Sequence, residues 1–139
     1  LWLRSEHTHA GRDGCRVPLP WVADAPGFGF SPTGASWLPQ PAAFAEYAAD
    51  VQTGVPGSTL ELYRETLALR REHRLGRGRL TWVADAPAGT LEFDNGDVRV
   101  IVNCSAAAVA LPADRVVAAQ SGPLTADGML PVNTAVWLV

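Results

Sequence analysis

The chain has 139 residues, a formal net charge of −3 and a hydrophobic share of 47% with five tryptophans. This length suits one ordinary domain, or a small domain joined to part of another. The acidic balance argues against a nucleic-acid partner, because phosphate backbones are bound by a basic surface. No apolar run approaches the roughly 18 residues of a membrane helix, which argues against a membrane partner.

The composition indicates what kind of protein and genome the chain comes from. Met129 is the only methionine and position 1 is Leu, so we expect a piece of a longer protein. Arginine without lysine, in a chain rich in Ala, Gly and Pro, indicates a GC-rich bacterial genome.

The two cysteines, Cys15 and Cys104, are isolated in the sequence, whereas folds built on disulfides use denser cysteine. We therefore expect two free, partly buried thiols in a cytoplasmic protein, with a disulfide as the alternative.

Residues 1–57 read as an ordered loop region. Proline and glycine are frequent, and so long an irregular stretch is rare in a compact domain unless it is functional or belongs to a larger body. Its aromatic content is too high for a disordered linker, with Trp21, Phe28, Phe30 and Trp37. We expect it to need a partner surface. Apolar residues at helical spacing predict a short helix over 42–51.

Residues 58–75 predict the clearest helix. Ser58 followed by Glu61 is a capping box, in which hydroxyl and carboxylate each accept from a free amide of the first turn. Gly76 is the expected C-terminal stop, after a last turn rich in basic residues that suit the helix dipole. Two apolar stripes indicate a helix packed between two bodies; they are Leu60, Tyr63, Leu67 and, opposite, Leu62, Leu69.

After residue 78 the apolar period changes from helical to two, which predicts strands. Asn95-Gly96 between two alternating segments is a strong hairpin signal. Shorter strands are expected near 107–111, 115–120 and 134–139. Many short strands separated by turns predict a small all-β antiparallel sandwich. About 60 residues make a marginal core, so we expect the helix to supply a packing face.

Chemistry is densest between residues 11 and 21. Arg12 and Arg16 flank Asp13, and a guanidinium fork binds a carboxylate or a pair of sugar hydroxyls. Pro18 and Pro20 stiffen the chain that follows, because each proline fixes φ and restricts its predecessor. Spacing alone favours the plainer interpretation, in which an Arg–Asp pair only holds a loop together.

Five motifs in chain order favour a sugar-binding role over the plainer interpretation. Together they resemble the α-glucosidases and oligo-1,6-glucosidases of the α-amylase family (glycoside hydrolase family 13). The first resembles R-D-x-x-R-x-P-x-x-W, the pattern that precedes the last barrel helix in that family. The motifs are Gly11-Arg12-Asp13-Gly14-Cys15-Arg16-Val17-Pro18-Leu19-Pro20-Trp21, Gly27-Phe28-Gly29-Phe30, Ser36-Trp37-Leu38-Pro39, Gln52 with Ser58-Thr59-Leu60-Glu61-Leu62-Tyr63-Arg64, and Leu69-Arg70-Arg71-Glu72-His73.

The resemblance implies a mixed fold. Residues 1–77 correspond to the end of a (β/α)8 barrel, with its last active-site loop and helix. Residues 78–139 correspond to the C-terminal β-sandwich. The missing N-terminal barrel is then the partner of this chain.

The resemblance also implies a function. The parent enzyme would be a retaining α-glucosidase that releases terminal α-linked glucose from oligosaccharides, using two carboxylates about 5 Å apart. The family takes these acids from upstream strands, so we expect no catalytic residue here and an inactive fragment. Arg16 is expected to bind sugar hydroxyls, while Arg12 and Asp13 shape the same loop. No cofactor or metal is implied.

Other signals are weaker. His7 and His9 are two imidazoles without further ligands at metal spacing, so loop histidines are expected. Trp21 and Trp37 are expected to pack in the loop, with stacking on sugar as the alternative.

The alternative function is a stand-alone carbohydrate-binding or interaction β-module. That module predicts a closed globule with aromatic faces turned outward, whereas the fragment predicts a poorly packed loop region and a helix with one exposed apolar stripe.

Overall fold

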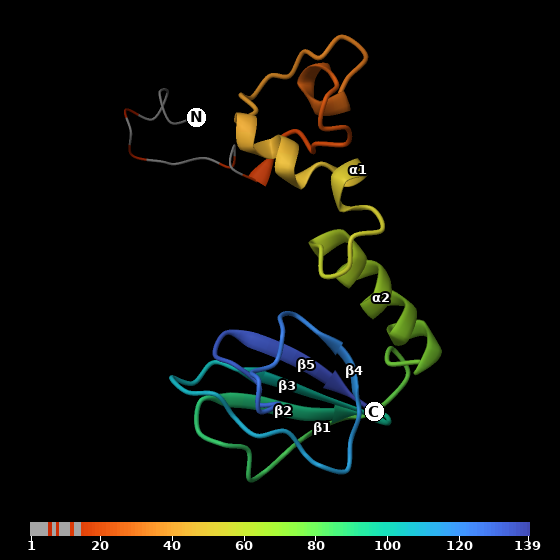
Figure 1. The fold of residues 1–139 in the computed structure, drawn as a ribbon, viewed down its shortest axis with the longest axis vertical. Helices are drawn as coiled ribbons and strands as arrows, with labels where there is room; N and C mark the ends of the chain where they lie inside the picture. The colour runs from red at the N-terminus through yellow and green to blue at the C-terminus, as the bar shows by residue number, and fades with distance from the viewer. Residues whose placement is uncertain (1–5, 7, 9–11, 13–14) are drawn as a thin grey trace. The chain divides into compact units, whose positions relative to one another are not determined.

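The computed structural model describes residues 6, 8, 12 and 15–139. It divides into two compact units, an N-terminal unit of residues 1–55 and a C-terminal unit of residues 56–139 (Figure 1). Asp13, Gly11, Gly14 and the two predicted loop histidines lie outside the described residues. The boundary expected between residues 77 and 78 concerns the parent fold and stays a prediction. No described helix is long and apolar enough to cross a bilayer.

Short helical turns build the N-terminal unit. They are the 3-10 helices Pro26–Gly29 and Ala42–Tyr47 and the α-helix α1, Ala49–Gln52. The single helix expected over 42–51 is therefore wrong, because Ala48 interrupts it with an extended backbone (φ −62°, ψ 146°). Ala48 is fully buried, and the break starts α1 afresh with its first amides free to bind elsewhere.

Helix α2 runs over Thr59–Glu72 and begins as its sequence predicts. The Ser58 hydroxyl accepts the Glu61 amide at 3.2 Å. None of the 14 helical residues is buried. On one side the helix contacts strand β4, and Leu62, Tyr63 and Thr66 line a cavity of about 140 Å³ against the sheet.

The end of α2 differs from the expected stop at Gly76. The left-handed residue is Arg74, with φ 52°. The Leu75 amide donates to the Arg70 carbonyl at 3.1 Å and the Arg74 amide donates to the Arg71 carbonyl at 3.2 Å, which is the Schellman pattern. This turn delivers Leu75 into the core, where it is 5% exposed and packs with Val98 and Val100.

Five antiparallel strands form one sheet in the order β1-β2-β3-β5-β4 (Figure 1). This confirms the all-β antiparallel C-terminal region. The sheet is a single layer among the described residues, and the segment expected as a strand at 107–111 makes only the bridge Val109 to Leu130. The strands are β1 Leu80–Trp82, β2 Thr90–Asn95, β3 Val98–Asn103, β4 Val117–Gln120 and β5 Thr134–Leu138.

Both faces of the sheet carry apolar residues, because side chains alternate along the central strand β3. Val98 and Val100 point to the face that holds Leu75 and Trp137. The opposite face is covered by the loops that the Val109–Leu130 bridge joins. Its cluster is Ile101, Leu130, Val136 and Leu138, with Val109, Leu111 and Leu124 packed against it.

Asn103 fixes these covering loops from the end of β3. Its side chain is fully buried. The amide nitrogen lies within 2.9–3.1 Å of the carbonyl oxygens of Ala107, Leu130 and Pro131, and its oxygen accepts from the Ser105 amide and hydroxyl. A buried polar group is tolerated because its hydrogen bonds are satisfied. The open sheet thereby gains a second layer made of loops.

We predict that Arg74→Gly stabilises the C-terminal unit. A side chain in the left-handed region costs about 1–2 kcal/mol, and part of this gain is offset by the greater unfolded-state entropy of glycine. The net increase in the free energy of unfolding should be about 0.5–1 kcal/mol, measured by urea denaturation. The matched control is Arg64→Gly inside α2, which should lose about 1 kcal/mol. Equal losses in the two variants would contradict the left-handed cap.

Candidate functional site

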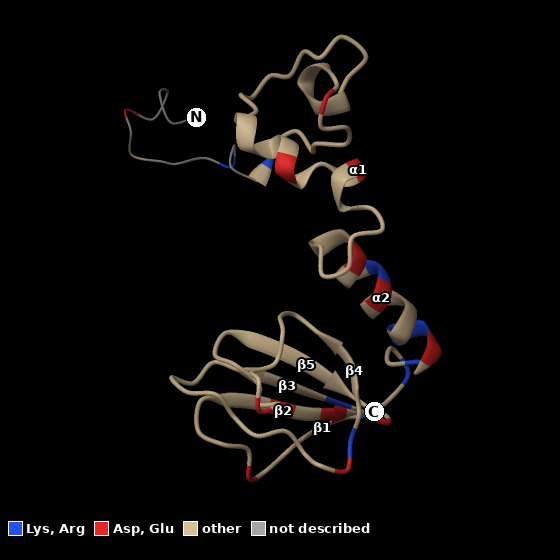
Figure 2. Ribbon diagram, viewed as in Figure 1, with Lys and Arg blue, Asp and Glu red and all other residues tan. Residues whose placement is uncertain are grey.

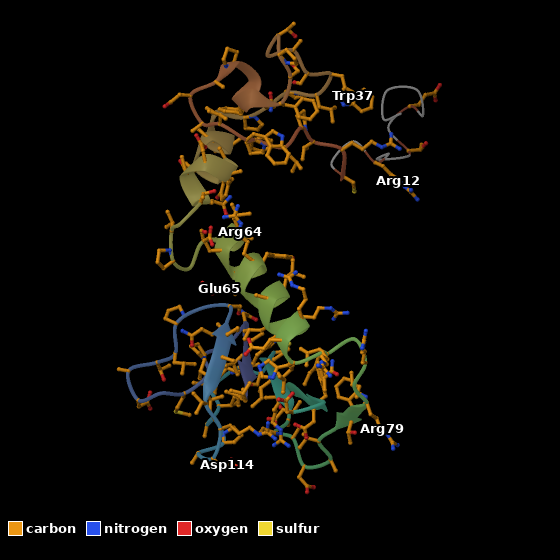
Figure 3. The ribbon with its side chains drawn as sticks, turned by 90° about the vertical axis from the view of Figure 1, so that its right-hand side faces the viewer. Arg12, Trp37, Arg64, Glu65, Arg79 and Asp114 are labelled. Carbon is orange, nitrogen blue, oxygen red and sulfur yellow. The ribbon has the colours of Figure 1, made fainter. Side chains whose placement is uncertain are left out.

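The loop that carries the predicted site residues begins with an exposed turn. The Cys15 amide donates to the Arg12 carbonyl at 3.1 Å, and both Arg12 and Arg16 are exposed. Figure 3 shows Arg12 and Trp37 in the N-terminal unit. Asp13, the third predicted site residue, lies outside the described residues. The turn therefore leaves two guanidinium groups accessible near the start of the described chain.

Pro18 anchors the chain just after Arg16. It is fully buried, while its neighbours Val17 and Leu19 are exposed. Proline fixes its own φ and holds the preceding residue in an extended conformation. Arg16 is thus two residues from a fixed point of the backbone.

The first turn of α1 holds the next part of the loop. The amides of Ala49 and Asp50 donate to the carbonyls of Pro20 and Trp21 at 3.2 and 3.1 Å. The Asp50 carboxylate accepts the Ala23 amide, with N–O distances of 3.1 and 3.2 Å. Free first-turn amides need such partners, and an acid at this end of a helix is favourable. We call these contacts the α1 clamp.

Sequence reasoning missed the α1 clamp. It assigned no role to Asp50, and it extended one helix across Ala48. The available signal was an acid near the start of a short apolar helix. Such an acid commonly satisfies amides from a neighbouring segment as well as from its own helix.

A tight turn fixes the loop from the other side. The amides of Trp21 and Val22 donate to the Phe28 carbonyl at 2.8 and 3.1 Å. Gly27 has φ 56°, and a Cβ there would collide with the Gly34 carbonyl oxygen. Gln40 also donates to the Gly27 carbonyl at 3.1 Å. These contacts give a physical reason for the glycine of the Gly27-Phe28 motif.

Two tryptophans beside this loop are more exposed than expected. Trp21 is 51% exposed and Trp37 is 71% exposed. The structure therefore does not pack these rings inside the loop. Each presents apolar surface that a sugar ring or another part of the protein can cover.

Among the described residues, the carboxyl groups with shifted pKa values are in the C-terminal unit. Hydrogen bonds from Arg99, at 2.8 and 2.9 Å, hold the pKa of Asp94 below its usual range. A hydrogen bond with His73 lowers the pKa of Asp97, and one from Thr125 lowers that of Asp127. A glycosidase acid needs a raised pKa. These three carboxyls are instead held ionised by structural partners.

The two cysteines, Cys15 and Cys104, are free, as expected. Both are exposed, so the expectation that they are partly buried is wrong. In the described part of the chain, no three His, Cys, Asp or Glu side chains gather as metal ligands. The groups available at the loop are therefore the hydrogen-bond donors of arginine and the indole rings.

No protein-family model matches the chain. It is 40% identical over 74 residues to a probable α-glucosidase of Rhizobium meliloti (strain 1021), covering 52% of this chain and 13% of that protein. The solved structure of the α-glucosyl transfer enzyme XgtA matches with 31% identity and a TM-score of 0.67, covering 93% of this chain and 26% of that one. These similarities confirm the resemblance to the C-terminal part of an α-glucosidase.

We predict that removing the Asp50 carboxylate loosens the loop. Asp50→Ala should raise the hydrogen-exchange rate of the Ala23 amide by roughly 5- to 30-fold, because the bond that protects it is worth about 1–2 kcal/mol. Asp24→Ala, an exposed acid in the same loop, is the matched control and should leave that rate unchanged. The same rate in all three proteins would show that the clamp is absent in solution.

Proposed function

We propose that this α-glucosidase-like chain is the C-terminal part of a retaining α-glucosidase of the α-amylase family. The proposed substrate is an oligosaccharide with a terminal α-linked glucose. The observation that carries the proposal is a clamped loop presenting Arg16, in a chain that is 40% identical over 74 residues to a probable α-glucosidase. A cytoplasmic location belongs to the same proposal.

In this proposal the N-terminal unit and α2 are the last active-site loop and helix of a (β/α)8 barrel, within residues 1–77. The exposure of α2 supports it. Tyr63 is 64% exposed and Leu67 is 49% exposed, although both belong to one apolar stripe. Most helical stability in proteins comes from packing such a face. The rest of the barrel is the partner that would cover it.

Arg16 acts in the proposed enzyme by binding and orientation. Its planar guanidinium can donate parallel hydrogen bonds to neighbouring hydroxyls of a terminal glucose. A barrel aspartate would pair with it and close the pocket around that sugar. Arg12 and Asp13 would shape the same loop, so this segment sets which end of the substrate enters.

The bond-breaking steps are assigned to the barrel. In retaining hydrolysis one carboxylate attacks the anomeric carbon, while a second carboxyl group, about 5 Å from the first, gives its proton to the leaving oxygen. This second group is then a carboxylate, and it acts as a base that takes a proton from the water that releases the sugar. The lowered pKa values of Asp94, Asp97 and Asp127 suit none of these proton transfers. The 139-residue chain by itself is proposed to be inactive.

Transfer to a sugar is the second candidate activity. It is favoured by the similarity to the α-glucosyl transfer enzyme XgtA over 93% of this chain. A covalent glucosyl intermediate can be released to a sugar hydroxyl as well as to water. The two activities differ only in the acceptor. Product analysis with and without an added acceptor sugar distinguishes them.

A stand-alone carbohydrate-binding module remains the alternative from another class. The exposed rings of Trp21 and Trp37 favour it, because aromatic faces stack on sugars. The exposed stripe on α2 favours the fragment instead, since a self-contained module would bury Leu67. Binding of maltooligosaccharide by the 139-residue chain with a micromolar Kd, lost in Trp37→Ala, would support the module.

We predict a specific defect when Arg16 is replaced in the protein that includes the upstream coding region. Arg16→Ala should lower kcat/KM for p-nitrophenyl α-glucoside by roughly 10- to 100-fold, because hydrogen bonds from a charged group contribute about 1.5–3 kcal/mol. Arg79→Ala, an exposed arginine outside the loop, is the control and should keep full activity. Unchanged kcat/KM in Arg16→Ala would remove Arg16 from the substrate site.

A further inference from the structure

A hollow of about 560 Å³ lies at the C-terminal end of α2. Four arginines line it with Gly76, and all four are exposed. They are Arg70, Arg71, Arg74 and Arg77. Figure 2 shows the blue segments of α2 toward this end. With Arg79, these are five of the eleven basic residues in a chain whose net charge is −3.

The arginines of this hollow have no carboxylate partner among the described residues. The ion pairs of the described chain use Arg64, His73, Arg99 and Arg115 instead. Glu61 forms an ion pair with Arg64 on the same helix, with an N–O distance of 2.7 Å. Four like charges have thus gathered without internal neutralisation, which is unfavourable unless a counter-charge arrives from outside.

Capping of the helix does not account for the cluster. The carbonyls of Leu69, Arg70 and Arg71 already accept the backbone amides of His73, Leu75 and Arg74. Arg77 lies beyond the last helical residue, Glu72. The helix dipole places roughly half a negative charge at this end, and four guanidinium charges exceed it several-fold.

The acidic residues Asp94 and Asp97 are bound by other side chains, and Glu72 does not line the hollow. His73 Nδ1 is 2.9 Å from Asp97 Oδ2, and the Asp94 carboxylate is bound by Arg99. Glu72 is exposed on α2 but does not line the hollow. Arg70 Nη2 lies 3.4 Å from where a Cβ of Gly76 would be, which is an ordinary van der Waals distance. The Arg70 guanidinium therefore lies beside the turn at Gly76.

We propose that this arginine hollow binds a small ligand that carries two or more phosphate groups. Guanidinium groups bind phosphate oxygens through paired hydrogen bonds, and the volume lies in the range of about 300–1,000 Å³ typical of small-molecule pockets. The net charge of −3 opposes a long polyanion such as nucleic acid. The site is independent of the proposed glucosidase function, because the glucosidic substrate is neutral.

Pyrophosphate is the probe for this site, titrated into the 139-residue chain by isothermal calorimetry at 50 mM salt. We expect saturable binding that is at least fivefold tighter than that of inorganic phosphate. Raising the salt to 200 mM should weaken it several-fold, since the contacts are ionic. Absence of pyrophosphate binding, or tighter binding of a duplex oligonucleotide, would overturn the proposal.

Paired variants identify the residues. Arg71→Gln with Arg74→Gln should raise the Kd for pyrophosphate at least tenfold, while Arg64→Gln on the same helix should change it less than twofold. Arg71→Lys with Arg74→Lys keeps the charge but removes the paired donors, and should weaken binding about threefold or more. Unfolding midpoints of all variants are compared to confirm folding. Equal Kd values in the double Gln variant and the parent would refute the site.

Discussion

The hydrogen bonds of the α1 clamp are the constraint on which the loop after Arg16 depends. The first amides of α1 hold the carbonyls of Pro20 and Trp21, and the Asp50 carboxylate holds the Ala23 amide. Pro18, which precedes these residues, is buried. Together these contacts fix the segment after Arg16, although it has no regular secondary structure. A loop that must place one donor against a substrate requires this kind of support.

The C-terminal unit is more complete in its sheet than in its helix. The loops gathered by Asn103 cover one face of the sheet, and Leu75 enters the cluster on the other. Helix α2 buries none of its residues. This contrast supports the proposal that α2 is a barrel helix, which the rest of the barrel would cover.

Local signals predicted the features that are decided locally. The hydroxyl of Ser58 caps α2. The hairpin that Asn95-Gly96 predicted is present, and its turn residues are Gly96, with φ 65°, and Asp97. Tertiary contacts decided the features that were missed. Ala48 breaks a regular apolar helix pattern so that α1 can hold the loop, and Arg74 occupies the left-handed cap in place of Gly76 because Leu75 is drawn into the core.

The candidate sites were predictable to different degrees. Motifs in register located the Arg16 loop, but no pattern indicated the hydrogen bonds that hold it. The arginines of the hollow appear in the sequence as a group of basic residues at the end of the predicted helix. The helix dipole was a sufficient explanation for them, and the acidic net charge of the chain gave no indication of an anion site. The satisfied carbonyls of the last turn and the absence of carboxylate partners among the described residues are the structural observations that support another role for these arginines.

The most direct test of the account measures release of p-nitrophenol from p-nitrophenyl α-glucoside by two proteins. One is the 139-residue chain, and the other is the same chain joined to the product of its upstream coding region. The account predicts turnover by the joined protein and a rate indistinguishable from the buffer for the chain alone. Turnover by the chain alone, abolished by replacing a carboxyl residue within it, would contradict the account.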